Sequence, residues 1–143
     1  MDPLSILASV TGILAVAAKI TTVVTKFIQS VGDVPASTRS VLTEATDLSL
    51  CLSQLTPFLR GTRTAERSRR DGISVEQVVA ISTSLVLSTS ELEKLLDSFK
   101  LNLPMSAFAR IQWVRNEERI NRILNRIRAS RSSLNLILTI FTW

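Results

Sequence analysis

The first thirty residues of the chain constrain its fold most. Residues 4–18 carry no charged side chain, and most side chains between residues 4 and 31 are apolar. A surface helix normally shows an apolar stripe about 100° wide opposite a broad polar face. Here the polar positions shrink to a narrow seam, formed by Ser5, Ser9, Gly12, Lys19, Thr22, Lys26 and Gln29. This segment is therefore predicted to be the central helix of a helical bundle, a helix that leaves the protein for a membrane, or both.

The uncharged run is short for a membrane-spanning helix. A spanning helix needs about 20 mostly apolar residues to cross a hydrocarbon core of about 30 Å. Residues 4–18 would extend only about 22 Å at about 1.5 Å per residue. The run spans a bilayer only if the Lys19 side chain snorkels to the interface or the bilayer thins.

A cleaved signal peptide is the other reading of this segment. Residues 15–17 (Ala-Val-Ala) resemble a cleavage site, but residues 1–3 (Met-Asp-Pro) lack the basic charge with which signal peptides begin. Asp2 instead suits a helix N-cap, and Pro3 suits the first helical position, where its missing N–H does no harm. We therefore expect a helix start here. Gly12, in mid-helix, predicts a close helix contact or a bend, unless it is merely tolerated.

Length and composition predict a single intracellular domain over residues 1–143. A chain of 143 residues can bury a substantial core. Four Gly and four Pro argue against an all-β fold built on many turns. The one cysteine, Cys51, rules out an intramolecular disulfide, and its place in an apolar helical run predicts a packed core thiol.

Apolar periodicity predicts four further helices. A second helix spans about residues 35–59, a third about residues 74–100, a short one about residues 105–115 and a last one about residues 117–141. Ser74 and Gln77 form a capping-box pattern at the start of the third helix, and residues 61–72 are predicted to be a loop. Phe108, Ile111 and Val114 mark the apolar side of the short helix. We therefore predict an all-α fold, an antiparallel four-helix bundle with one extra short helix before the last long helix.

The chain lacks the side chains on which most enzyme chemistry depends. It has no His and no Tyr, which removes the commonest general base and the commonest metal ligand. Glu91 and Glu93 are two residues apart on a helix, so they do not face each other as a carboxylate pair would. No glycine-rich phosphate loop is present. We therefore expect no catalytic residues, no metal site and no cofactor, and we expect that the protein is not an enzyme.

Positive charge is concentrated in the second half of the chain. Fourteen of the 17 Lys and Arg residues lie between residues 60 and 143, and the net charge is +5. The spacing of four arginines would place them on one helix face: Arg115, Arg119, Arg122 and Arg126. These form the candidate site for anionic lipid, with Arg128 and Arg131 on its flank. A solvated face without function is the alternative, and no nucleic-acid-binding motif accompanies the arginines.

Several short segments resemble one family along the whole chain. They are residues 1–6 (MDPLSI), 41–44 (VLTE), 47–49 (DLS), 52–55 (LSQL) and 132–140 (SSLNLILTI). In their order and spacing they look like the HeLo-like N-terminal domain of fungal STAND proteins, which are receptors of the NOD-like type. The resemblance implies a helical bundle that kills the cell as part of innate immunity. On signalling, such domains oligomerise and permeabilise the membrane, and their N-terminal helix is thought to insert.

The resemblance gives this chain a set of expected partners and sites. The membrane-inserting residues would be Leu4, Ile6, Leu7, Val10, Ile13 and Leu14. The partners would be anionic membrane lipids, further copies of the chain, and an upstream receptor or C-terminal regulatory region not present in this sequence, but no nucleic acid. The protein would be cytoplasmic at rest and at the plasma membrane when activated. The alternative function is a non-lytic helical adaptor or oligomerisation module of a signalling receptor.

Overall fold

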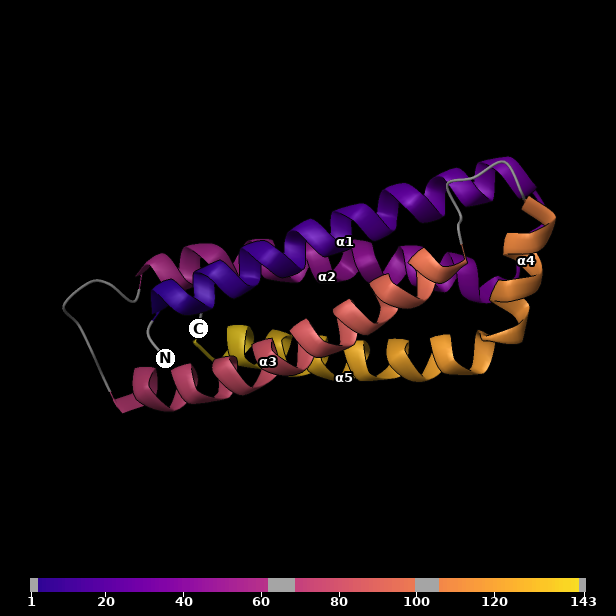
Figure 1. Ribbon diagram of the computed structural model, residues 1–143. Helices are drawn as coiled ribbons and strands as arrows, with labels where there is room; N and C mark the ends of the chain where they lie inside the picture. The colour runs from indigo at the N-terminus through magenta and orange to yellow at the C-terminus, as the bar shows by residue number, and fades with distance from the viewer. Residues whose placement is uncertain (1–2, 62–68, 100–105, 142–143) are drawn as a thin grey trace.

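The chain folds into α-helices, and the prediction of an all-α fold is confirmed. The computed structural model describes residues 3–61, 69–99 and 106–141 (Figure 1). Within these residues there is no strand. The elements are α1 (Pro3–Val31), α2 (Ala36–Gly61), α3 (Arg69–Ser98), α4 (Ser106–Arg115) and α5 (Glu117–Phe141).

The four long helices lie lengthwise beside one another, and α4 crosses one end of them (Figure 1). α1 packs against α2 and α3, and α5 packs against the same two helices from the other side. α4 contacts α1 and α5. α1 therefore has one side in the core and the other in solvent, as α5 has.

The core consists of the apolar stripes that the periodicity predicts for α2, α3 and α5. The stripe of α5 is buried throughout its described side chains: Ile120, Ile123, Leu124, Ile127, Leu134, Ile137 and Leu138. In α2 the spacing predicts a stripe that is buried except for Leu59, whose side chain lies outside the described residues: Val41, Ala45, Leu48, Leu52, Leu55 and Leu59. In and directly after α3 it predicts a stripe that is buried except for half-buried Ile81: Val78, Ile81, Leu85, Leu92, Leu95 and Phe99. Spacings of three and four residues put these side chains on one face of each helix, which explains the agreement.

The start of α3 differs from the prediction. The helix begins at Arg69, so residues 69–72 are helical and Ser74 lies inside the helix rather than at its N-cap. Residues 62–68 of the predicted loop lie outside the described residues. A capping-box pattern requires only two residue types three positions apart, and polar residues inside a helix satisfy it by chance.

The apolar side of α4 also differs from the prediction. Phe108, Ile111 and Val114 are exposed, whereas Ala109 and Trp113 on the opposite side of the helix are buried. The indole of Trp113 stacks on the ring of Phe27 in α1 at a centroid distance of 5.5 Å. A large aromatic ring buries more apolar area than an aliphatic side chain, so it determines which face of this short helix turns inward.

Two glycines of the N-terminal region have different structural roles. Gly32 has a φ of 77°, and its N–H donates to the Ile28 carbonyl at 3.0 Å directly after α1 ends. Only glycine adopts this left-handed conformation freely, so Gly32 terminates the helix. Gly12 lies on the exposed side of α1, and a Cβ built there meets no atom within 4 Å. The prediction that Gly12 makes a close helix contact is therefore wrong.

Candidate membrane-binding and effector surfaces

The residues predicted to insert into a membrane hold α1 to the rest of the protein. Ile6, Val10 and Ile13 are buried, and Leu7 and Leu14 are half-buried against the same core. The side chain of Leu4 lies outside the described residues. If these side chains enter lipid, α1 has to separate from α2 and α3 first. The large apolar side chains of α1 are thus buried or half-buried in the folded protein, whereas the helix as a whole is not largely buried.

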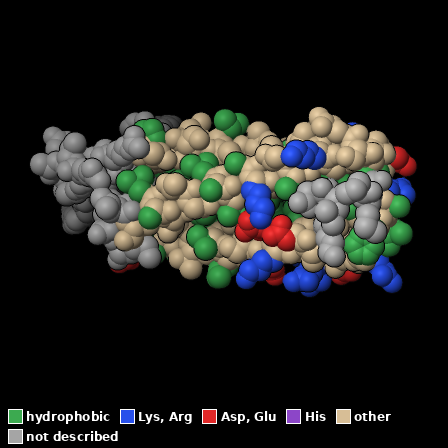
Figure 2. All heavy atoms as spheres, turned by 45° about the horizontal axis from the view of Figure 1, so that its top comes forward, with side chains coloured by type: hydrophobic (Ala, Val, Ile, Leu, Met, Phe, Trp, Pro, Cys, Tyr) green, Lys and Arg blue, Asp and Glu red, His purple; other side chains and the backbone are tan. Residues whose placement is uncertain are grey.

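The outer face of α1 consists of small side chains without charge. From residue 5 to residue 18 its exposed residues are Ser5, Ala8, Thr11, Gly12, Ala15 and Ala18. Figure 2 shows charged side chains gathered toward one end of the visible face, whereas apolar and uncharged side chains predominate between them and the grey atoms at the other end. Solvent-facing helix positions normally carry charged residues, as those of residues 118–128 in α5 do. The outer face of α1 meets solvent, so burial does not explain its lack of charged residues.

α1 is also long enough to cross a bilayer. Among the described residues it is the one helix that is apolar and long enough, with a mean hydropathy of 1.9 over a window within Ser5–Val31. The 27 residues from Ser5 to Val31 would extend about 40 Å at about 1.5 Å per residue. Core helices of soluble proteins reach similar values, but such helices are mostly buried, whereas 28% of this window is buried.

An ion-pair cluster on α3 holds the first charged residue of α1. The Lys19 ammonium lies 3.0 Å from a carboxylate oxygen of Glu93 and 3.3 Å from one of Asp97. Lys19 directly follows the uncharged run, so this pairing fixes α1 along α3 at that point. Glu91, two residues before Glu93, pairs instead with α5, so the two carboxylates face different neighbours as predicted.

Three of the four candidate lipid-binding arginines lie together on α5. Arg119, Arg122 and Arg126 are exposed and line one surface groove with Glu91 of α3. The Arg126 guanidinium lies 2.5 Å from a Glu91 carboxylate oxygen, which neutralises part of the charge of the groove. Arg115 is exposed as well, but it is the last residue of α4. The four-residue spacing therefore does not put Arg115 on the same helix face as the other three.

The two arginines predicted on the flank of this face, Arg128 and Arg131, instead hold a buried carboxylate. Glu44 of α2 is only 4% exposed, and its two oxygens accept hydrogen bonds from Arg128 Nε at 3.2 Å and Arg131 Nε at 2.6 Å. A second bond from Arg131 Nη2 measures 3.3 Å. The hydrogen bonds with Glu44 raise the pKa of Arg131. This cluster is a cross-link between α2 and α5.

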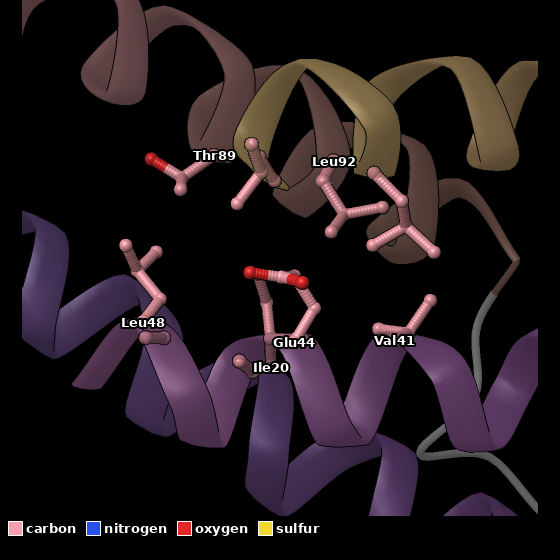
Figure 3. Close-up of a pocket in the computed structure, with 10 residues that line it drawn as sticks. Ile20, Val41, Glu44, Leu48, Thr89 and Leu92 are labelled. Carbon is pink, nitrogen blue, oxygen red and sulfur yellow. The ribbon is translucent and has the colours of Figure 1, made fainter. Parts of the chain in front are cut away.

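The Glu44 side chain also borders an interior cavity between α1, α2, α3 and α5. Figure 3 shows its carboxylate above Ile20 and between Val41 and Leu48, directed toward the helices on the opposite side. The cavity measures about 10 Å³, close to the smallest volume that holds one water molecule. It is too small for a cofactor or substrate.

Sequence reasoning missed the Glu44 cluster, although a signal for it is present. Glu44 falls three residues after Val41 and four before Leu48, so it interrupts the apolar stripe of α2. Arg131 interrupts the stripe of α5 between Ile127 and Leu134 in the same way. An acidic residue on one buried stripe and a basic residue on another predict a buried pair, because neither charge is stable there alone.

A hydrogen-bonded group at the α4 end joins α2, α4 and α5. Trp113 Nε1 donates to Ser37 Oγ at 2.8 Å, and the Ser37 hydroxyl donates to the Glu117 carboxylate. The Trp113 indole also meets the Phe99 ring edge-on at 5.9 Å. Glu117 lies in the first turn of α5, as predicted. These contacts fix the orientation of α4 across the end of the long helices.

Cys51 is a buried thiol, as predicted, and it lies close to the Glu44 cluster. Burial raises the pKa of this thiol, and only the charge of Arg131 acts in the opposite direction. A raised pKa keeps the thiol protonated and unreactive at neutral pH. In the described part of the chain, no group of three or more His, Cys, Asp or Glu residues is arranged to hold a metal ion.

Comparison with models of protein families, with curated proteins and with solved structures found nothing that matches this chain. Functional inference therefore depends on the surfaces described above.

Proposed function

We propose that this protein is a membrane-targeting cell-death effector of the HeLo-like kind and not an enzyme. Its long helices would form an antiparallel four-helix bundle closed at one end by α4. In the resting state α1 packs on α2 and α3. On activation α1 separates, enters the membrane and permeabilises it together with the α1 helices of other copies.

The observation that carries this proposal is the uncharged outer face of α1. A helix with one side in water gains nothing in the folded protein from excluding charge over residues 5–18. In a bilayer the same feature is essential, because a charged side chain at the centre of an inserted helix costs about 2.5–3.5 kcal/mol. Both faces of α1 are thus compatible with lipid, although only one is covered in the folded protein.

The small side chains of this face also support self-association. Ala8 and Gly12 are four residues apart, as are Thr11 and Ala15. Small residues at this spacing let helix backbones approach closely inside a membrane, where packing replaces the hydrophobic effect as the driving force. The exposed Gly12, which makes no close contact in the folded protein, would have such a contact in an assembly of α1 helices.

The arginines of α5 supply the attraction to an anionic membrane. Arg119 and Arg122 are exposed, and each basic residue near such a surface contributes about 1 kcal/mol. Arg126 contributes less because Glu91 is its partner. Replacing Arg119 and Arg122 by Glu should weaken binding to anionic vesicles at least about 30-fold. Exposed Arg39 on α2 provides the control, since Arg39→Glu changes the net charge away from the groove.

The decisive experiment places charges on the outer face of α1. Ala8 and Ala15 are exposed, so Ala8→Asp with Ala15→Asp should leave the folded protein intact by circular dichroism. The same charges would oppose insertion, and dye release from anionic vesicles should fall by more than 100-fold. Ala80→Asp on the exposed side of α3 is the matched control and should leak vesicles as the wild type does.

The alternative function is a non-lytic helical adaptor or oligomerisation module, and the burial of α1 favours it. Ile6, Val10 and Ile13 belong to the main core, so α1 separates only at the expense of many apolar contacts. If wild-type protein releases no dye, or if the charged α1 variant releases as much as the wild type, α1 does not insert. The adaptor function then becomes the better account.

A further inference from the structure

The short helix α4 presents an apolar face to solvent. Ile111 is 55% exposed, Val114 is 53% exposed and Phe108 is 38% exposed. They are separated by three residues each, so they form one stripe along a helix about 15 Å long. Three large apolar side chains on one short helix form a patch, which monomeric surfaces normally avoid unless the patch binds something.

The outward direction of this stripe is fixed by the packing of the other side of α4. Trp113 is fully buried, stacked on Phe27 and hydrogen-bonded to Ser37. Arg110, at the edge of the stripe, donates from Nε to the backbone carbonyl of Asp33 at 3.1 Å. α4 cannot rotate to hide Ile111 and Val114 without breaking these contacts. The exposed face is therefore a stable feature of the folded protein.

Basic residues accompany the stripe. Within Ser106–Arg115 the charged residues are Arg110 and Arg115, with no acidic residue. Arg110 is paired with Asp33 at 3.5 Å, whereas Arg115 is exposed in the last turn. The arginine groove of α5 begins at Arg119, four residues further along the chain. At the α4 end of Figure 2, apolar and basic side chains lie next to each other.

We propose that the outer face of α4 is the surface by which the folded protein docks on an anionic lipid bilayer. Apolar side chains flanked by arginines are typical of helices that lie in a membrane interface, with the side chains among the acyl chains and the guanidinium groups at the phosphates. Ile111 and Val114 would enter the interface, and Arg115 would contact the headgroups. This surface differs from α1, because it is exposed before any helix separates.

The inference rests on the proposed membrane function, and it adds docking on the bilayer as a step before α1 separates. Docking through α4 requires no change in the core, so the folded protein would bind the bilayer before α1 separates. α4 lies at the end of the molecule opposite to the beginning of α1 (Figure 1). Membrane binding and membrane permeabilisation should therefore depend on different residues.

The test is co-sedimentation of the full chain with vesicles of phosphatidylcholine containing phosphatidylserine. Ile111→Ser with Val114→Ser should weaken binding roughly 10-fold or more, because the two half-exposed side chains lose their transfer into the interface. Leu50→Ser with Leu87→Ser is the matched control, since Leu50 is 60% exposed and Leu87 is 66% exposed on other helices. All four positions face solvent, and circular dichroism confirms that each variant is folded.

Three results would overturn this inference alone. One is equal binding by the α4 variant and the wild type, and another is equal weakening by the control variant. The third is a wild type that elutes as a dimer in size-exclusion chromatography without vesicles, together with an α4 variant that elutes as a monomer. The stripe would then be an interface between two copies. Failure of the proposed function has a different signature: the wild type releases no dye, or Ala8→Asp with Ala15→Asp releases as much as the wild type, whatever α4 does. A wild type that binds no anionic vesicles overturns both.

Discussion

The buried pair of Glu44 and Arg131 should be the most sensitive polar contact of the fold. We consider Arg131→Met, which keeps most of the volume of the side chain and removes its charge. Arg131 makes two of the three hydrogen bonds that reach the Glu44 carboxylate. Glu44 is 4% exposed, so bulk water solvates its carboxylate poorly in the folded protein.

The size of the expected loss of stability follows from the burial of Glu44 and its dependence on Arg131. A hydrogen bond to a charged group contributes about 1.5–3 kcal/mol, and a buried carboxylate without its partner costs more than an exposed one. Because Arg128 retains one bond to Glu44, we expect a loss of about 2–3 kcal/mol in the free energy of unfolding. For a domain of this size that corresponds to roughly 5–10 °C in melting temperature.

The assay is urea unfolding followed by circular dichroism at 222 nm, with Arg126→Met as the matched control. Arg126 is on the same helix, but it pairs with half-exposed Glu91 at the surface, where ion pairs contribute about 0–1 kcal/mol. Adding Glu44→Leu to Arg131→Met should restore part of the stability, because no buried charge then remains unpaired. Equal losses for Arg131→Met and Arg126→Met would refute the reasoning.

Three smaller predictions concern other parts of the fold. Gly12→Ala should raise the free energy of unfolding by about 1 kcal/mol, because the added Cβ meets open space. Gly32→Ala should lower it by about as much, because the φ of Gly32 is 77°. The melting temperatures of the two variants should therefore shift in opposite directions. Burial raises the pKa of Cys51, so the folded state keeps a proton that the unfolded state loses above about pH 8.5. The free energy of unfolding should therefore fall as the pH rises through the folded pKa. The thiol should react with a disulfide reagent only when the protein unfolds. Ser37→Ala should cost about 1–2 kcal/mol and change the near-ultraviolet circular dichroism of Trp113, which loses its hydrogen-bond acceptor; an unchanged spectrum would mean that the indole is held by ring packing alone.

The sequence by itself determined where the helices are and which face of each long helix is buried. Helix formation and amphipathicity depend on residues three and four apart, so Val41, Leu48 and Leu85 could be assigned to the core without knowledge of their partners. The absence of charge in residues 4–18 was equally visible. Whether that absence reflected burial could not be read from the pattern, because a central helix and a membrane-entering helix have the same composition.

Only the tertiary structure decided which surfaces remain free. In the folded protein one side of α1 lies in solvent, and Ile111 and Val114 point outward. Arg131 pairs with buried Glu44, whereas Arg119 is exposed. Each of these outcomes depends on residues far away in the chain: Phe27 and Ser37 orient α4 through Trp113, and Glu44 selects Arg131 from a row of similar arginines. The local pattern determines which residues share a helix face. Which of these faces meets solvent depends on whether another part of the chain packs against it.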